Sequence, residues 1–231
     1  MRVIVTRARG DAARTAAALR ARGHEALLSP VLEIVSTGVA ISPGQAQALM
    51  ATSAHAFETL SRADAARLAQ LPLFVVGART AQAAADAGLP PPRLVAASSF
   101  DLAQQIAAAA SGPTRWLYLA GHDRKPDLEA ALERQGFSVD VAVTYEAGAI
   151  DALSEEVRQG LLHGDADAVL HFSARSARLF MGCAATAGLR PQAAALRHIC
   201  ISHEAAADLP RGAVIAPTPD SAGLLKALEQ M

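Results

Sequence analysis

The chain has few of the residues that mark disulfide-rich or metal-binding domains. Its 231 residues include only two cysteines, Cys183 and Cys200, and neither belongs to a CxxC pair or to zinc-like spacing. The seven histidines form no HxH or HxxxH pair. We therefore expect no disulfide framework, no metal site and a reducing compartment, which indicates the cytoplasm.

Long apolar runs and basic stretches are also missing. The apolar run Val3–Val5 is followed at once by Thr6-Arg7, which is too short for a signal peptide. No stretch approaches the roughly 20 apolar residues that a membrane span needs. The formal net charge is −1, with no basic stripe of the kind that binds nucleic acid. We expect neither a membrane nor a nucleic-acid partner, so local groups must hold any anionic substrate.

Three motifs of nucleotide and hydrolase chemistry are absent. The chain contains no GxxxxGK[ST], no GxGxxG after its first apolar run and no GxSxG. This disfavours nucleoside triphosphate hydrolysis, dinucleotide binding of the Rossmann type and a nucleophile elbow. Hydrophobic residues make up 52% and charged residues 19%, which is typical of a folded globular protein.

What the chain does contain is a recurring unit of strand, polar turn and helix. In its clearest copy, Val75–Leu89, two β-branched residues lead into Gly77, a turn with Arg79 and Thr80 follows, and an alanine-rich helix ends at Gly88. Such a unit places backbone N–H groups and hydroxyls at the carboxyl end of a strand, where open α/β sheets bind ligands. The N–H groups at a helix start also favour anions.

The unit occurs at six more places. These are Val3–Gly23, Gln47–Leu60, Trp116–Gly136, Ala168–Phe180, His198–Leu209 and Ala213–Leu228. The alternation predicts an α/β fold with two doubly wound parallel-sheet domains, because so many units fit two small sheets better than one wide sheet. The extended stretches Ser29–Val35 and Val143–Ala147 are the expected linkers. We expect one discontinuous domain of residues 1–34 and 147–231 and an inserted domain of residues 35–146.

Small hydroxyl residues, glycines and arginines occupy the turns after the predicted strands. The candidate substrate-binding residues at these turns are Thr6, Arg7, Thr52, Ser53, Gly77, Arg79, Thr80, Gly121, Arg124, Ser173, Arg175 and Ser202. Hydroxyls and backbone N–H groups bind carboxylates, and guanidinium groups add charge. For any single hydroxyl taken alone, a helix cap is the favoured interpretation. Their coincidence at several strand ends is what favours a binding role.

Two further residues have alternative interpretations. Tyr145 follows the alternating strand Val139–Thr144 at a predicted linker, and its phenol could donate a hydrogen bond or a proton. The alternative is an aromatic plug beneath the linker. His171 lies within the apolar run AVLHF, and we interpret it as a partly buried residue with its hydrogen bonds satisfied rather than as a base.

Taken together, these motifs resemble those of the uroporphyrinogen-III synthase family over nearly the whole chain and in the family's order. The most specific are GARTA at Gly77–Ala81 and VAVTYE at Val141–Glu146. Departures also occur. The family's usual TRP near the start is TRA at Thr6–Ala8, and Ser202 begins the turn in which the family commonly has a threonine.

The resemblance implies a fold, a reaction and a role for one residue. It implies two α/β domains on two extended connections, with the active site in the cleft between them. The enzyme, a lyase of heme, siroheme and cobalamin synthesis, would take hydroxymethylbilane, remove its terminal hydroxyl, invert the last ring and close uroporphyrinogen III. No cofactor or metal takes part. Tyr145, carried over from the family's tyrosine, would assist departure of the hydroxyl, and we expect a monomer.

Two other classes of function remain open at this point. A two-domain cleft protein could only bind a small anionic ligand, and the same fold could serve as the sensor module of a regulator. Incubation with hydroxymethylbilane separates the first of these from the enzyme, because a pure binder leaves only the uninverted isomer I.

Overall fold

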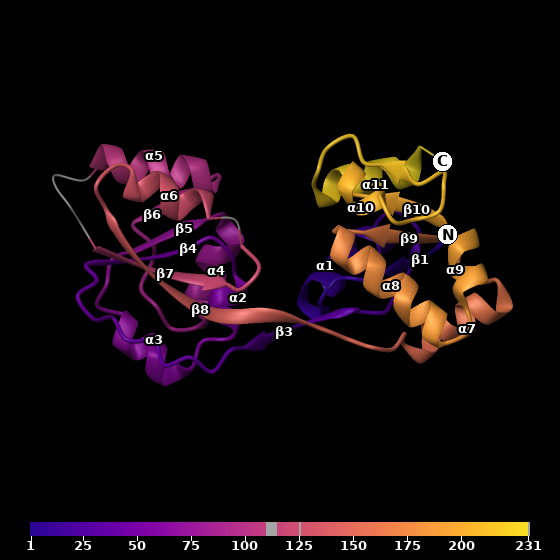
Figure 1. Cartoon of the computed structure of the whole chain (residues 1–231), viewed down its shortest axis with the longest axis horizontal. Coiled ribbons are helices and arrows are strands. Elements are labelled where there is room, and N and C mark those ends of the chain that lie inside the picture. The colour runs from indigo at the N-terminus through magenta and orange to yellow at the C-terminus, as the bar shows by residue number, and fades with distance from the viewer. Residues whose placement is uncertain (110–114, 125, 231) are drawn as a thin grey trace. The chain divides into compact units, whose positions relative to one another are not determined.

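The chain folds into two compact units of nearly equal size. The computed structural model describes residues 1–109, 115–124 and 126–230, and Figure 1 shows its elements. One unit, here the terminal unit, consists of Met1–Glu33 and Gly148–Met231, and the other, the inserted unit, is Ile34–Ala147. Within the described ranges, every helix is too short or too polar to cross a membrane.

The terminal unit contains a five-stranded sheet. Its strands are β1 (Arg2–Val5), β2 (Glu25–Leu28), β9 (Ala168–His171), β10 (Arg197–Cys200) and β11 (Val214–Ile215). They lie in the order β11-β10-β9-β1-β2, with parallel pairing throughout. From β1 the chain continues to β2 on one side, and from β9 it continues to β10 on the other side. The boundary between β1 and β9 is therefore the topological switch point, where doubly wound sheets bind ligands.

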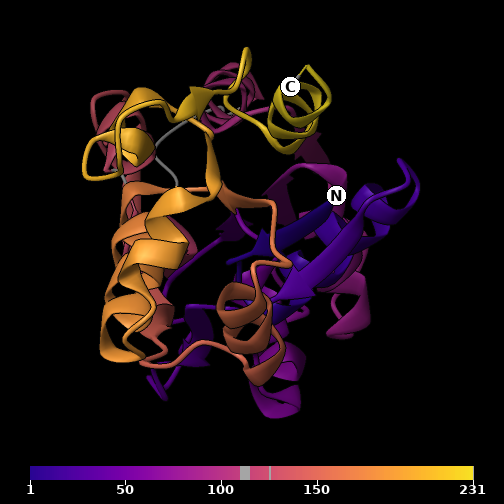
Figure 2. The same cartoon turned by 90° about the vertical axis from the view of Figure 1, so that its right-hand side faces the viewer.

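Helices cover both faces of this sheet. They are α1 (Arg9–Arg20), α7 (Glu155–His163), α8 (Ala174–Thr186), α9 (Arg190–Ala195), α10 (His203–Ala206) and α11 (Ser221–Glu229), and Figure 2 turns this unit toward the viewer. Successive strand residues point to opposite faces. Val3 and Val5 accordingly pack with α1 and α11, whereas Ile4 packs with α7 and α8.

The inserted unit contains a six-stranded sheet. Its strands are β3 (Leu32–Ser36), β4 (Ala48–Ala51), β5 (Leu73–Val76), β6 (Leu94–Ala96), β7 (Arg115–Gly121) and β8 (Ser138–Ala149), in the order β3-β8-β7-β4-β5-β6. The pairs from β8 to β6 are parallel. Here the switch point lies between β4 and β7, because the chain leaves β4 toward β5 and returns on its other side at β7.

Helices also cover both faces of the second sheet. They are α2 (His55–Glu58), α3 (Arg62–Leu68), α4 (Ala78–Asp86), α5 (Ser99–Ala109) and α6 (Asp127–Glu133). Leu49 and Leu117 pack with α2, α3 and α4. Met50 and Trp116, on the opposite face, pack with α5 and α6. The predicted α/β class with parallel sheets is confirmed.

The two connecting strands are hydrogen-bonded to each other. The amide of Thr37 donates to the carbonyl of Thr144 at 3.1 Å, and the amide of Ile150 donates to the carbonyl of Val31 at 3.0 Å. Residue numbers rise along β3 while they fall along β8, so this pair is antiparallel. It adds an antiparallel pair to the predicted parallel sheets, because the chain leaves the terminal unit along β3 and returns along β8.

Candidate functional site

Each sheet gathers the predicted site residues at its carboxyl edge. In the terminal unit Thr6 and Arg7 follow β1, and Ser173 and Arg175 follow β9. The register pairs Val5 with Leu170 and Leu170 with Ile199, so these strand ends lie side by side. Ser202, after β10, joins the same edge. These five residues therefore lie along the carboxyl edge of one sheet, with Thr6, Arg7, Ser173 and Arg175 at the switch point and Ser202 beside it.

The hydroxyl groups of this edge already have partners within the protein. Thr6 is fully buried, and its hydroxyl donates to the carbonyl of Leu170 at 3.0 Å. Ser173 caps α8 by accepting from the amide of Ser176 at 3.1 Å, and Ser202 caps α10. For Ser173 and Ser202 the alternative interpretation as helix caps is therefore correct. What this edge offers a ligand is mainly backbone N–H groups and arginines.

The arginines of this edge are held by neighbouring groups. The guanidinium of Arg7 contacts the carboxylate of Asp11 at 2.9 Å and the hydroxyl of Ser221 at 3.2 Å, and it lies 4.3 Å from the ring centroid of Phe172. Arg175 lines a cavity of about 450 Å³ along α8 with Arg178 and Asp151. Arg7 is thus fixed and partly neutralised, so it would bind a substrate carboxylate by sharing or exchanging Asp11.

The inserted unit presents the second polar edge. Thr52 and Ser53 follow β4, and β7 ends at Gly121. The turn after β5 carries Gly77, Arg79 and Thr80, and Arg124 follows β7. The register pairs Ala51 with both Val75 and Leu119, and Gly121 with Tyr145 of β8. This edge therefore brings together the hydroxyls, the turn glycines, two arginines and the tyrosine that the sequence singled out.

Tyr145 lies directly over Gly121. A Cβ atom at Gly121 would lie 2.7 Å from two ring carbons of Tyr145 and 2.9 Å from its hydroxyl oxygen. The ladder has a bulge at this point, and the amide of His122 donates to the carbonyl of Tyr145 at 2.9 Å. Gly121 therefore leaves room for the phenol ring, which makes it a packing partner of Tyr145 more than a ligand contact.

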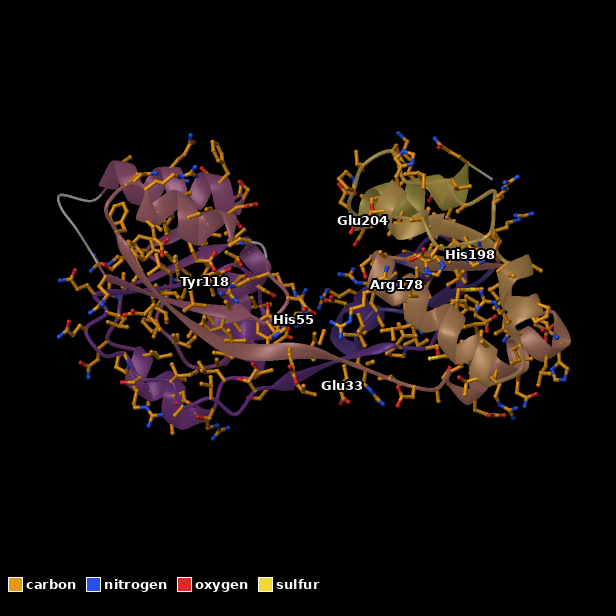
Figure 3. The ribbon with its side chains drawn as sticks, viewed as in Figure 1. Glu33, His55, Tyr118, Arg178, His198 and Glu204 are labelled. Atoms are coloured by element: carbon orange, nitrogen blue, oxygen red, sulfur yellow. The ribbon has the colours of Figure 1, made fainter. Side chains whose placement is uncertain are left out.

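Tyr118, the chain's other tyrosine, was not among the sequence candidates. Its hydroxyl lies 2.8 Å from that of Thr52, one residue beyond the end of β4. Burial raises the pKa of the Tyr118 phenol, the hydrogen bond with Thr52 opposes that rise, and the charge of Glu129 adds to it. Tyr118, labelled in Figure 3, therefore stays protonated, and its hydroxyl holds that of Thr52 in place.

The arginines of the inserted edge also have carboxylate partners. Arg79 contacts Glu58 at 3.1 Å, and Arg124 contacts the buried Glu129 at 2.7 Å. Thr80, in the first turn of α4, is buried after Gly77, whose φ of 79° suits glycine. Charge at this edge is thus arranged in pairs, which gives a polar surface of nearly balanced charge.

His55 is a second residue that sequence reasoning missed. It is the first residue of α2, and its Nδ1 lies 2.6 Å from the carboxylate of Glu58. Its ring meets that of Tyr145 edge to face, with 5.7 Å between centroids. The available signal was the spacing in ATSAHAFETL, where a histidine and a glutamate three residues apart follow a strand end and share one helix face.

A separate pair of histidines is buried in the terminal unit. His171 is fully buried, and its ring stacks on that of His198 with centroids 5.2 Å apart. His198 Nε2 lies 3.0 Å from the carbonyl of Ala193 and must donate to it, so His198 Nδ1 accepts from His171 Nε2 at 2.9 Å. His171 Nδ1 has no hydrogen-bond partner among the described residues. Our interpretation of His171 as partly buried and satisfied is wrong, because adjacent strands β9 and β10 enclose it.

This pair should make the protein sensitive to acid. Burial, reinforced by His198, lowers the pKa of His171 to about 3, and burial also lowers the pKa of His198. The unfolded chain therefore takes up protons below its ordinary histidine pKa of about 6.5, while the folded chain does not. We expect urea titrations to show a free energy of unfolding about 2 kcal/mol lower at pH 5 than at pH 7.

A variant comparison isolates the contribution of the pair. His171→Asn should flatten this pH dependence, whereas His203→Gln, which changes an exposed histidine, should leave it as in the parent. Equal slopes in all three proteins would show that the buried pair does not cause the acid sensitivity.

The histidines, cysteines and acidic residues of the described parts of the chain do not cluster. Across residues 1–109, 115–124 and 126–230, no three histidine, cysteine or acidic side chains are grouped so that they could hold an ion. Both cysteines are buried as free thiols, and burial raises the pKa of Cys200 to about 11. The groups that the edges present are hydroxyl, phenol, imidazole, guanidinium, carboxylate and backbone N–H groups.

Two doubly wound sheets with polar carboxyl edges define the class of α/β proteins whose ligands bind at the carboxyl ends of the strands. Comparison with known families identifies it further. The family model of uroporphyrinogen-III synthase HemD matches residues 13–226. The chain belongs to the uroporphyrinogen-III synthase family, and it is an enzyme of tetrapyrrole synthesis with the family's function.

Solved structures of similar proteins agree with the fold. The uroporphyrinogen-III synthetase of Helicobacter pylori aligns over 100% of both chains with a TM-score of 0.63 and 19% identity. A mutant uroporphyrinogen III synthase of Thermus thermophilus aligns over 100% of both chains with a TM-score of 0.53 and 20% identity. A comparison with curated protein sequences finds no match.

Proposed function

We propose that this chain is a cyclising lyase that converts hydroxymethylbilane to uroporphyrinogen III, with Tyr145 as the proton donor. The observation that carries the assignment of Tyr145 is its place on β8 over Gly121, at the carboxyl end of β7, which borders the switch point, and among paired polar side chains. Ligands of doubly wound sheets bind at such an edge. The two compact units would act as the domains 1–34 with 147–231 and 35–146.

The reaction needs one proton delivered and one removed. In the first step the phenol of Tyr145 donates its proton to the terminal hydroxyl of the substrate, the C–O bond breaks and water leaves. The remaining azafulvene cation closes through a spiro intermediate, which inverts the last ring. The closing pyrrole carbon then loses a proton, which restores the Tyr145 phenol, so the net products are uroporphyrinogen III and one water.

Orientation of the substrate is the larger part of what the enzyme must achieve. The substrate cyclises unaided to the uninverted isomer, so the protein must hold the chain in one conformation and keep water away from the cation. The acetate and propionate groups of the substrate match the backbone N–H groups at the starts of α1, α4 and α8. Guanidinium groups would also bind the substrate carboxylates. Those of Arg7, Arg79 and Arg124 would do so while shared with their present carboxylate partners, and that of Arg175 would add a further positive charge.

Analysis of the product isomers tests this function. Incubation of the protein with hydroxymethylbilane should give predominantly uroporphyrinogen III, while the same mixture without protein gives isomer I. A product composed of isomer I alone, despite binding of the substrate, would support the ligand-binding alternative and contradict the enzyme.

The buried free thiols are consistent with a reducing compartment, and we propose a cytoplasmic monomer.

A further inference from the structure

His55 contacts the proposed proton donor without belonging to the predicted site. Its ring and that of Tyr145 meet edge to face, with an interplanar angle of 64° and centroids 5.7 Å apart. The two residues lie on different elements, α2 and β8, and are 90 residues apart in the sequence. Figure 3 labels His55 in the inserted unit. This contact brings a side chain of α2 against one of β8 at the carboxyl edge of the sheet.

A carboxylate and an arginine hold the His55 ring in place. Nδ1 of His55 lies 2.6 Å from one oxygen of Glu58, and the guanidinium of Arg79 lies 3.1 Å from the other. Although burial raises the pKa of Glu58, the hydrogen bonds and charges of His55 and Arg79 outweigh it and lower the pKa overall. The Glu58 carboxylate therefore stays charged and orients the imidazole.

We infer that His55 is a positioning residue that acts through Tyr145. The inference rests on the proposed function. A protonated imidazole beside the phenol ring favours the phenolate that forms when Tyr145 gives up its proton, because opposite charges attract across a partly buried contact. A neutral imidazole loses this effect. Turnover should therefore fall as His55 loses its proton on the alkaline side.

Other charged groups also lie near this contact, among them the exposed imidazole of His122, whose backbone amide donates to the carbonyl of Tyr145. Helix α2 packs against α4 and β7, which contribute Arg79 and Tyr118. Arg79 keeps its charge at every working pH, and burial raises the pKa of Tyr118 above its ordinary value near 10. Glu58, on α2 itself, has its pKa lowered and is already ionised. Imidazoles ordinarily change charge between pH 5 and 8, so the His55→Gln variant is needed to separate the effect of His55 from that of His122.

Steady-state kinetics with hydroxymethylbilane between pH 6 and 9 test the inference, with the spontaneous reaction subtracted. We expect His55→Gln to lower kcat about tenfold at pH 6.5, with KM little changed, and to remove the alkaline decline. Glu58→Gln keeps the imidazole but removes its carboxylate partner, so the decline should move to lower pH. Asp64→Asn breaks an exposed pair with Arg67 on α3 and should match the parent.

Two results would overturn the inference. One is a His55→Gln protein with the parent's kcat and pH profile, and the other is a change confined to KM. If His55→Gln does not fold, the pH dependence of kcat in Glu58→Gln decides the question. An alkaline decline of kcat at the same pH as in the parent would contradict the role of His55. Failure of the proposed function is a different result, since the parent protein would then form no isomer III at any pH.

Discussion

Replacement of Tyr145 by phenylalanine is expected to lower kcat about 100-fold or more, because a positioned proton donor contributes roughly that factor. The phenylalanine ring keeps the packing over Gly121 and against His55, so the fold should be retained. Stopped assays of isomer III formation measure the loss, and circular dichroism with thermal unfolding checks the fold.

Tyr118→Phe is the matched control, since it makes the same chemical change at the only other tyrosine. Tyr118 is buried and bonded to Thr52, so its loss should cost about 1 kcal/mol of stability and change kcat far less. If Tyr145→Phe keeps near-parent turnover, Tyr145 is not the proton donor and the mechanism above is wrong.

Gly121→Ala is expected to have the second large effect. The added methyl would lie 2.7 Å from ring carbons of Tyr145, a separation at which the ring must move. Overpacking of this kind costs about 1–3 kcal/mol of stability. We also expect a loss of kcat approaching that of Tyr145→Phe, because a displacement of about 1 Å at a reacting group can cost two orders of magnitude.

Two comparisons separate this effect from a general cost of substituting glycine. Gly182→Ala adds a methyl at an exposed position of α8 where no side chain or neighbouring segment lies within 4 Å, so stability and turnover should be preserved. In the double variant Gly121→Ala with Tyr145→Phe, kcat should fall little below that of Tyr145→Phe alone, since both changes act on one group. Fully additive losses would show that Gly121 serves some function other than seating the ring.

The α/β fold was predictable because local signals and packing agree along most of the chain. The runs at Val3–Val5 and Leu73–Val76 are apolar and β-branched, and each is followed by a polar turn and an alanine-rich helix. Such repeated units leave a parallel sheet as the natural way to bury both faces. The pairing of β3 with β8 was not predictable, because nothing local in an extended linker specifies its partner strand.

The edge of the site was predictable, but its internal contacts were not. Residues that follow strands of a parallel sheet must lie at one edge, which is why Thr52 and Arg79 were identified together. Tyr145 was expected to follow a strand but lies within β8, and it reaches this edge because it pairs with Gly121. Contacts such as those of His55 with Tyr145 and His171 with His198 depend on register and helix placement. These are set by tertiary packing, so the sequence offered only the spacing of His55 and Glu58 as a signal.

The central claim is that the carboxyl edges of the sheets bind the tetrapyrrole, and hydrogen–deuterium exchange with and without uroporphyrinogen III tests it most directly. The account predicts slower exchange on binding in the turns after β4, β5 and β7, around Thr52, Arg79 and Gly121, and in those after β1 and β9. Protection confined to the opposite, amino-terminal ends of these strands, with the turns unchanged, would contradict it.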